Sequence, residues 1–117
     1  MTAYTLLHNP RCSKSRETLQ LLTDKGIDME VREYLKHPLS IEELKTVLSK
    51  LDTSARNLLR TGEEEYSSLG LANNALTEEA ILKAIADHPR LLQRPILIGP
   101  QKAAVGRPPE LVLEILS

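Results

Sequence analysis

A stretch near the N-terminus reads Tyr4-Thr5-Leu6-Leu7-His8-Asn9-Pro10-Arg11-Cys12-Ser13-Lys14-Ser15-Arg16. Its first five residues form a short, mainly apolar run that is typical of a buried strand, and Asn9-Pro10 indicates a turn directly after it. Beyond the turn, Leu19 and Leu22 stand among polar residues at helical spacing as far as Lys25. The stretch therefore predicts a strand and then a helix, with Cys12 at the start of that helix.

A second strand follows the predicted helix. Gly26 suits the position just after the end of a helix, and Met29 to Tyr34 alternates apolar and charged side chains as a strand does. A strand, a helix and a strand within about 35 residues form a βαβ unit. We therefore expect these two strands to be parallel, with a right-handed crossover.

The middle of the chain, about residues 38–92, predicts a helical insertion. Ser40-Ile41-Glu42-Glu43 matches a capping box at the start of a helix. Further helix starts are expected at Thr53-Ser54 and at Thr77, because both positions offer a capping hydroxyl. His88-Pro89 ends the last of these helices, since a residue before proline disfavours helical geometry.

The C-terminal part predicts a β-hairpin and a closing helix. Pro95 to Ile98 and Ala103 to Val105 supply the strands. Pro108-Pro109-Glu110 begins the helix, whose expected buried face comprises Leu111, Leu113 (or Val112), Ile115 and Leu116. The 117 residues thus predict one α/β domain: a mixed four-stranded sheet flanked by helices, with the helical insertion between strands 2 and 3.

Composition excludes several classes of protein. The net charge of −1 disfavours a protein whose main ligand is a nucleic acid. The longest apolar runs, such as Ile96-Leu97-Ile98, are too short to cross a membrane, and the N-terminus lacks the basic start and apolar stretch of a signal peptide. A single cysteine without a Cys-His cluster indicates a cytoplasmic protein. His8, His37 and His88 are too scattered to predict a metal site.

Cys12 is the candidate nucleophile. The first turn of a helix presents unpaired N–H groups and a partial positive charge, which favour a thiolate. Arg11, Lys14 and Arg16 add positive charge, and the same N–H groups suit a tetrahedral oxyanion. A buried, inert cysteine is the alternative, but polar and charged neighbours disfavour it. Ser15 stands where a C-x-x-C motif would have its second cysteine, so a resolving thiol must come from glutathione or another protein.

Three further arginines are candidates for binding an anion: Arg60, Arg94 and Arg107. A solvated surface charge is the ordinary interpretation of each one. Arg94 and Arg107 both precede proline, which fixes the local backbone and makes them less ordinary. If the insertion folds over the start of the first helix, the three planar guanidinium groups converge on one tetrahedral anion.

The chain resembles the glutaredoxin-coupled arsenate reductases over nearly its whole length, and within them the chromosomal YfgD-like branch. The stretches that carry the resemblance are His8-Asn9-Pro10-Arg11-Cys12 with Ser15-Arg16, Leu58-Leu59-Arg60, Tyr66-Ser67-Ser68-Leu69-Gly70-Leu71, His88-Pro89, Arg94-Pro95-Ile96 and Arg107-Pro108-Pro109-Glu110. The loop Arg11-Cys12-Ser13-Lys14 is more basic than the small residues of the plasmid-type enzymes.

The resemblance implies a fold and a reaction. The fold would be thioredoxin-like, with Pro95 as a cis-proline. Cys12 would attack arsenate, His8 would tune the site, and Ser15 would donate a hydrogen bond to the thiolate. The oxyanion-binding residues would be Arg60, Arg94 and Arg107. Glutathione would act as co-substrate and glutaredoxin would release arsenite, without a metal or an organic cofactor.

Two other functions stay open at this point. One is a glutathione-dependent thiol oxidoreductase with another substrate, such as a mixed disulfide. The other is a non-catalytic interaction module like the Spx regulators, although those often carry a C-x-x-C switch that this chain lacks. The three arginines favour an oxyanion substrate over both. Glu63-Glu64-Glu65 is interpreted as a charge run on a solvated helix face or loop.

Overall fold

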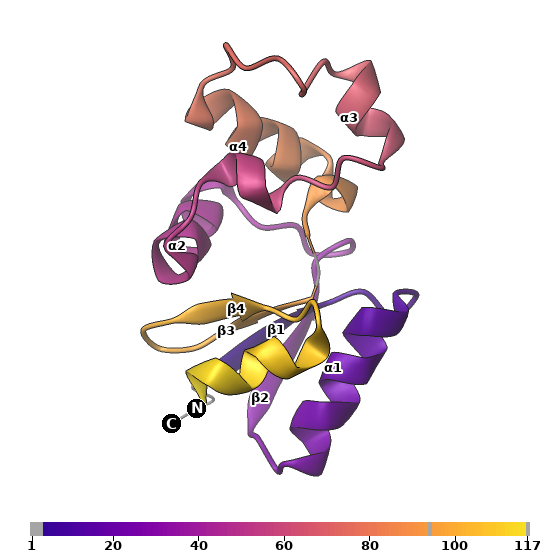
Figure 1. The fold of residues 1–117 in the computed structure, drawn as a ribbon, viewed down its shortest axis with the longest axis vertical. Helices are drawn as coiled ribbons and strands as arrows, with labels where there is room; N and C mark the ends of the chain where they lie inside the picture. Colours follow the sequence, from indigo (N-terminus) through magenta and orange to yellow (C-terminus); the bar gives the residue numbers. More distant parts are fainter. Residues whose placement is uncertain (1–3, 94, 117) are drawn as a thin grey trace. The chain divides into compact units, whose positions relative to one another are not determined.

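The computed structural model describes residues 4–93 and 95–116 of the chain. The helices and strands follow in the order β1 (Tyr4–His8), α1 (Ser13–Asp24), β2 (Met29–Glu33), α2 (Ile41–Leu51), η1 (Ala55–Leu58), α3 (Glu64–Ser68), α4 (Glu78–Asp87), η2 (Pro89–Leu91), β3 (Ile96–Ile98), β4 (Ala103–Val105) and η3 (Pro109–Ile115), where η denotes a 3-10 helix. Figure 1 traces this order along the chain. The chain divides into two compact units, residues 1–37 with 94–117, and residues 38–93.

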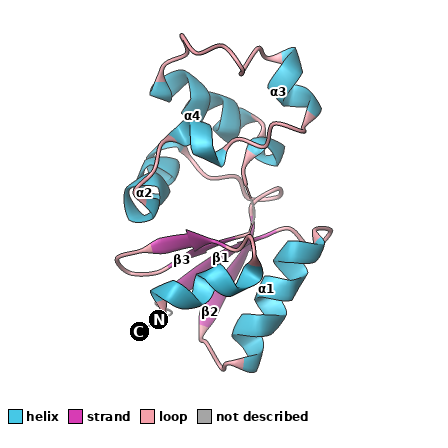
Figure 2. Ribbon diagram, viewed as in Figure 1, coloured by secondary structure: helices cyan, strands magenta, loops and turns pink. Residues whose placement is uncertain are grey.

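The first unit contains a four-stranded sheet with the order β2-β1-β3-β4. β1 is parallel to β2, whereas β3 is antiparallel to both β1 and β4. The predicted mixed sheet is therefore confirmed, together with its βαβ start and its C-terminal hairpin. α1 and η3 lie on one face of the sheet (Figure 2), where Leu6, Leu22, Leu97 and Val112 form a fully buried cluster.

The closing helix differs from the expectation in its buried face. It is a 3-10 helix, and Leu111 is exposed while Pro109 and Val112 are buried. A 3-10 helix has three residues per turn, so residues 109, 112 and 115 lie on one side. The prediction for Leu111 assumed the α-helical period and was wrong for this reason.

The regular secondary structure of the second unit consists of helices and one isolated bridge between Leu59 and Leu92. The predicted capping box is present: Glu43 N–H donates to Ser40 Oγ at 3.1 Å and Ser40 N–H donates to Glu43 Oε1 at 3.0 Å. α4 begins in a similar way, with Ala80 N–H donating to Thr77 Oγ1. α2 packs against α4, and their apolar faces supply much of this unit's core. The expectation of a single domain with an insertion at about 38–92 stays a prediction.

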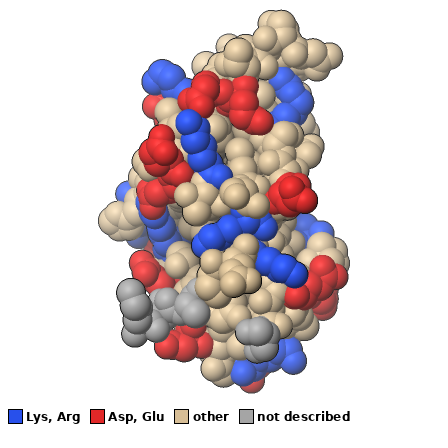
Figure 3. Space-filling view, turned by 90° about the vertical axis from the view of Figure 1, so that its left-hand side faces the viewer, with Lys and Arg blue, Asp and Glu red and all other residues tan. Residues whose placement is uncertain are grey.

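The surface mixes charges of both signs on the face drawn in Figure 3. This pattern agrees with 15 basic and 16 acidic residues in the sequence. None of the helices within residues 4–93 and 95–116 combines the length and apolar character that crossing a bilayer requires.

Candidate active site

Cys12 occupies the N-cap position of α1, between the Asn9-Pro10 turn and the first helical residue. Its N–H donates to the Asn9 carbonyl at 3.0 Å, and its own carbonyl accepts from Arg16 N–H at 3.0 Å. The first turn of α1 contains no acidic residue. The partial positive charge of the helix N-terminus is therefore not offset within that turn.

The guanidinium of Arg107 lies beside the sulfur of Cys12, although the two residues are 95 positions apart in the sequence. Arg107 Nη2 donates to Cys12 Sγ at 3.7 Å. The approach depends on Gly106, because a Cβ there would lie 2.8 Å from Thr18 Oγ1 and 2.9 Å from Pro95 Cγ. Only a residue without a side chain lets the segment after β4 pass so close to α1.

The site is also where the buried polar residues gather. In the described part of the chain, the buried polar residues are His8, Asn9, Ser15 and Thr18, all at the end of β1 or in the first turns of α1. Burying a polar group costs free energy unless it is hydrogen-bonded. Such a concentration beside one cysteine is typical of a functional site and not of a simple core.

A compact hydrogen-bond network joins these groups. Ser15 Oγ lies 2.7 Å from His8 Nδ1 and accepts from Asn9 N–H at 3.0 Å. Asn9 Oδ1 accepts from Arg11 N–H, and Thr18 Oγ1 donates to the Lys14 carbonyl. Arg16 Nη1 donates to the Pro10 carbonyl at 3.0 Å and ties the loop to the helix. The network ties the cysteine loop to α1.

The protonation of His8 decides how Ser15 uses its proton. Burial lowers the pKa of His8 below its ordinary value of 6.5, the neighbouring Glu33 opposes this shift, and Arg16 lowers the pKa further. A neutral His8 whose Nδ1 accepts lets the Ser15 hydroxyl donate to it. The Ser15 hydroxyl has one proton, so it can donate to Cys12 only when His8 Nδ1 carries a proton and donates to Ser15 Oγ. The predicted hydrogen bond from Ser15 to the Cys12 thiolate therefore stays a prediction for the form of His8 that is protonated at Nδ1.

Five of the six predicted site residues lie in the described part of the chain, and they belong to both units. The structure brings His8, Cys12, Ser15 and Arg107 together in the first unit. Arg60 belongs to the second unit. Arg94 lies outside the described residues, and so does the peptide bond that was expected to make Pro95 a cis-proline. The Arg107–Pro108 bond is cis.

Arg60 lies among charged side chains that the sequence did not single out. Arg60 Nε lies 3.5 Å from Glu63 Oε1, and Arg90 Nη2 donates to Glu63 Oε2 at 3.1 Å. Arg90 Nη1 also lies 3.8 Å from Glu65 Oε2. The interpretation of Glu63-Glu64-Glu65 as a solvated run was wrong for Glu63 and Glu65, whose side chains are only 17% and 20% exposed. Their ion pairs with arginine offset part of the cost of this burial.

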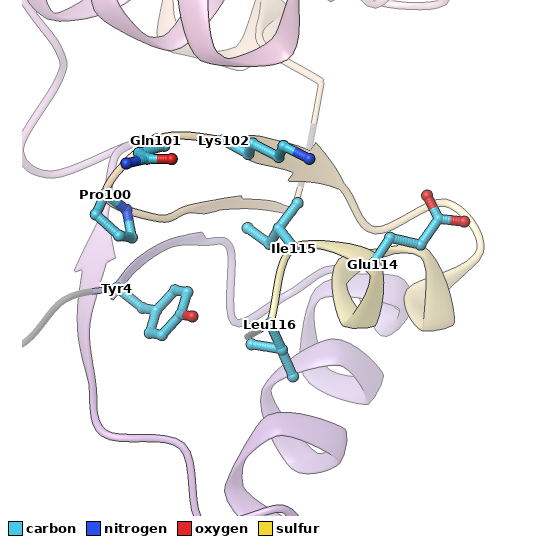
Figure 4. Close-up of a pocket in the computed structure, with 7 residues that line it drawn as sticks. All are labelled: Tyr4, Pro100, Gln101, Lys102, Glu114, Ile115 and Leu116. Atoms are coloured by element: carbon cyan, nitrogen blue, oxygen red, sulfur yellow. The ribbon is translucent and has the colours of Figure 1, made fainter.

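Other features of the first unit lie apart from Cys12. A hollow of about 400 Å³ is lined by Tyr4, Pro100, Gln101, Lys102, Glu114, Ile115 and Leu116 (Figure 4). Tyr4 and His8 mark opposite ends of β1, so this hollow lies at the end of the strand away from Cys12. Within residues 4–93 and 95–116, no three His, Cys, Asp or Glu side chains come together as a metal site would require.

Comparison with known proteins assigns the family. The sequence matches the ArsC family over residues 7–115. The chain belongs to the ArsC family. It is 49% identical over 117 residues to a protein named arsenate reductase from Neisseria meningitidis serogroup A, covering 99% of this chain and 100% of that one. It is also 49% identical to a protein of Escherichia coli K12 whose name is "Uncharacterized protein YfgD", over 95% of this chain and 94% of the relative.

The fold comparison agrees with the ArsC assignment. The solved structure of an arsenate reductase from Vibrio cholerae superposes with a TM-score of 0.95 at 45% identity and covers 98% of both chains. The thioredoxin-like fold expected from the resemblance is thereby confirmed. The sequence motifs around Cys12, Arg60 and Arg107 identified the correct family.

Proposed function

We propose that this ArsC protein is an oxidoreductase that reduces arsenate to arsenite through the thiolate of Cys12. The observation that carries the proposal is the Arg107 guanidinium 3.7 Å from Cys12 Sγ, at the N-terminus of α1. Both groups favour a thiolate and a bound oxyanion at the same place. The relatives named arsenate reductase, at 49% identity over nearly the whole chain, support this substrate.

The reaction balances with two external thiols. The Cys12 thiolate attacks arsenic(V), an S–As bond forms, and an arsenate oxygen leaves as water after protonation. Glutathione displaces a second oxygen as water and forms a mixed thiol adduct. A glutaredoxin thiolate then attacks the glutathione sulfur, and the electron pair of the bond between that sulfur and arsenic stays on arsenic, which becomes arsenic(III). Hydrolysis releases arsenite and returns Cys12, while glutathione and glutaredoxin leave as a mixed disulfide.

External thiols follow from the cysteine content of the chain. Cys12 is its one cysteine, and Ser15 stands at the position of a second C-x-x-C cysteine. Glutathione is therefore proposed as co-substrate, glutaredoxin as the protein partner, and the cytoplasm as the reducing compartment that sustains the cycle. Arg60 and Arg94 are proposed to join Arg107 in binding the oxyanion, because forked guanidinium donors match tetrahedral oxyanions.

The test is arsenate-dependent NADPH oxidation coupled through glutathione reductase, with glutathione and glutaredoxin each omitted in separate arms. The wild-type protein should turn over only in the complete mixture, and Cys12→Ser should lose turnover while keeping its far-ultraviolet circular dichroism. Turnover retained by Cys12→Ser would remove the nucleophile assignment. A wild-type protein that is inactive although Cys12 is alkylated rapidly at neutral pH would rule out arsenate as the substrate.

A further inference from the structure

Asn9 makes three hydrogen bonds around the cysteine loop, residues 9–12. Its N–H donates to Ser15 Oγ at 3.0 Å and so joins the end of β1 to the first turn of α1. Its side-chain Oδ1 accepts from Arg11 N–H at 3.0 Å, and its carbonyl accepts from Cys12 N–H at 3.0 Å. Asn9 therefore ties the strand to the helix and also folds the loop that carries Cys12.

Hydrogen bonds, and not packing, hold the tip of this loop. Pro10 and Arg11 are exposed, whereas Asn9 is only 7% exposed. The ring of Pro10 restricts its own φ but leaves no N–H to donate. An asparagine side chain that accepts from the N–H two residues on fixes a turn, and Asn9 closes the same turn with its carbonyl. The conformation of the loop therefore depends on both acceptors of Asn9.

The turn decides where the sulfur of Cys12 lies. Cys12 is the N-cap residue of α1, with φ of −94° and ψ of 124°, and its side chain makes no capping hydrogen bond to the helix. Its sulfur lies 3.7 Å from Arg107 Nη2. This contact requires the Cα of Cys12 to stay where the turn places it, because the short side chain cannot compensate for a shift of the backbone.

We infer that Asn9 is a positioning residue for Cys12: its side-chain oxygen and its carbonyl fold residues 9–12 into the turn that keeps the sulfur beside Arg107 at the N-terminus of α1. The inference rests on the proposed function, in which Cys12 is the nucleophile, but it does not depend on arsenate being the oxyanion. Displacing a reacting group by about 1 Å can cost on the order of 100-fold in rate, so this turn is a sensitive point of the site.

The experiment compares Asn9→Ala with Asn9→Ser. The two side chains differ by one hydroxyl, which in serine accepts from the N–H two residues on, although more weakly than asparagine does. The pH dependence of Cys12 alkylation by iodoacetamide gives the midpoint of thiolate formation, and the coupled assay gives kcat/KM for arsenate. We expect Asn9→Ala to lower kcat/KM on the order of 100-fold and to shift the midpoint upward, because the sulfur moves away from Arg107. Asn9→Ser should lie measurably closer to the wild-type protein in both.

Asn73 supplies a matched control, because it makes the same two turn bonds in the second unit. Its Oδ1 accepts from Ala75 N–H at 2.9 Å, and its carbonyl accepts from Leu76 N–H at 3.3 Å. Within residues 4–93 and 95–116, all the hydrogen bonds of Asn73 go to residues of its own unit. Asn73→Ala should therefore leave the alkylation midpoint of Cys12 in place, even if it lowers the unfolding temperature.

A second pair of variants keeps the test decisive if Asn9→Ala unfolds. Asn9→Thr and Asn9→Val have nearly the same shape and fill more of the buried space than serine and alanine do, and they differ in the same hydroxyl acceptor. Thermal unfolding of every variant shows which proteins are folded at the assay temperature. Among the folded variants, Asn9→Val should have the higher alkylation midpoint and Asn9→Thr the lower one.

The outcomes separate the positioning role from the proposed reaction. An alkylation midpoint that Asn9→Ala leaves at the wild-type value would overturn the positioning role, and so would a serine variant that behaves as the alanine variant does. A shift of the same size in Asn73→Ala would overturn it too, because the effect would then not be specific to the cysteine loop. If the wild-type protein does not turn over arsenate but the Asn9 variants shift the midpoint as expected, the proposed reaction falls and the positioning role stands.

Discussion

Arg107 and Cys12, which are 95 positions apart in the sequence, meet at the N-terminus of α1 with Nη2 3.7 Å from Sγ. A cation at this distance stabilises the thiolate relative to the thiol. The contact therefore links the last loop of the fold directly to the nucleophile.

Replacing Arg107 by alanine should raise the pKa of the Cys12 thiol and lower the turnover of arsenate on the order of 100-fold, the effect of losing one donor to a developing oxyanion. The pH dependence of Cys12 alkylation by iodoacetamide measures the first effect, and the coupled assay measures the second. Lys102→Ala removes a cation from the opposite end of the first unit and should change neither. An alkylation profile that Arg107→Ala leaves in place would show that Arg107 does not act on the thiolate.

Ser15 is fully buried and joins His8 to the backbone of Asn9. Ser15→Ala should lower the free energy of unfolding by about 1–3 kcal/mol, because it leaves buried polar partners unsatisfied. Urea unfolding measures this change. Ser13→Ala removes an exposed hydroxyl from the same helix and is the matched control. If both variants unfold at the same urea concentration, the network around Ser15 contributes nothing to stability.

The sequence predicted the features that depend on near neighbours. The β1–α1 junction with Cys12, the capping box of Ser40 and Glu43, and the C-terminal hairpin all follow from residues a few positions apart. The family motifs added Arg107, whose partner no local pattern reveals.

The features that the sequence did not predict depend on distant partners. Glu63 is paired with Arg90, 27 positions away, and in the sequence alone it looks like any acid in a charged run. Gly106 matters because Thr18 and Pro95 pack against it, which only the folded chain shows. Thr18 belongs to no sequence motif, and its side chain lies against Gly106, just after β4.

Gly106→Ala tests whether the close approach of the segment after β4 to α1 positions Arg107. The added Cβ would lie 2.8 Å from Thr18 Oγ1 and 2.9 Å from Pro95 Cγ. We expect a loss of about 1–3 kcal/mol in the free energy of unfolding, as for other overpacked sites, together with slower Cys12 alkylation at neutral pH as Arg107 moves away. Gly62→Ala, where the added Cβ meets no atom within 4 Å, is the control. If Gly106→Ala is as stable as the wild-type protein, the side chains of Thr18 and Pro95 can move to accommodate the added Cβ, and close packing at Gly106 is not required.

The lowered pKa of His8 makes stability depend on pH in a defined direction. His8 has a pKa below 6.5 in the folded state because burial disfavours the charged imidazolium. Well above pH 6.5 the residue is neutral in both the folded and unfolded states, and its contribution to stability is complete. As the pH falls below 6.5, the unfolded chain takes up a proton before the folded chain does, so the free energy of unfolding decreases until His8 also protonates in the folded state.

Urea unfolding between pH 7.5 and pH 5 should show this decrease, and His8→Gln should flatten it because glutamine does not titrate. A slope that persists unchanged in His8→Gln would assign the pH dependence to other groups and remove His8 as its source.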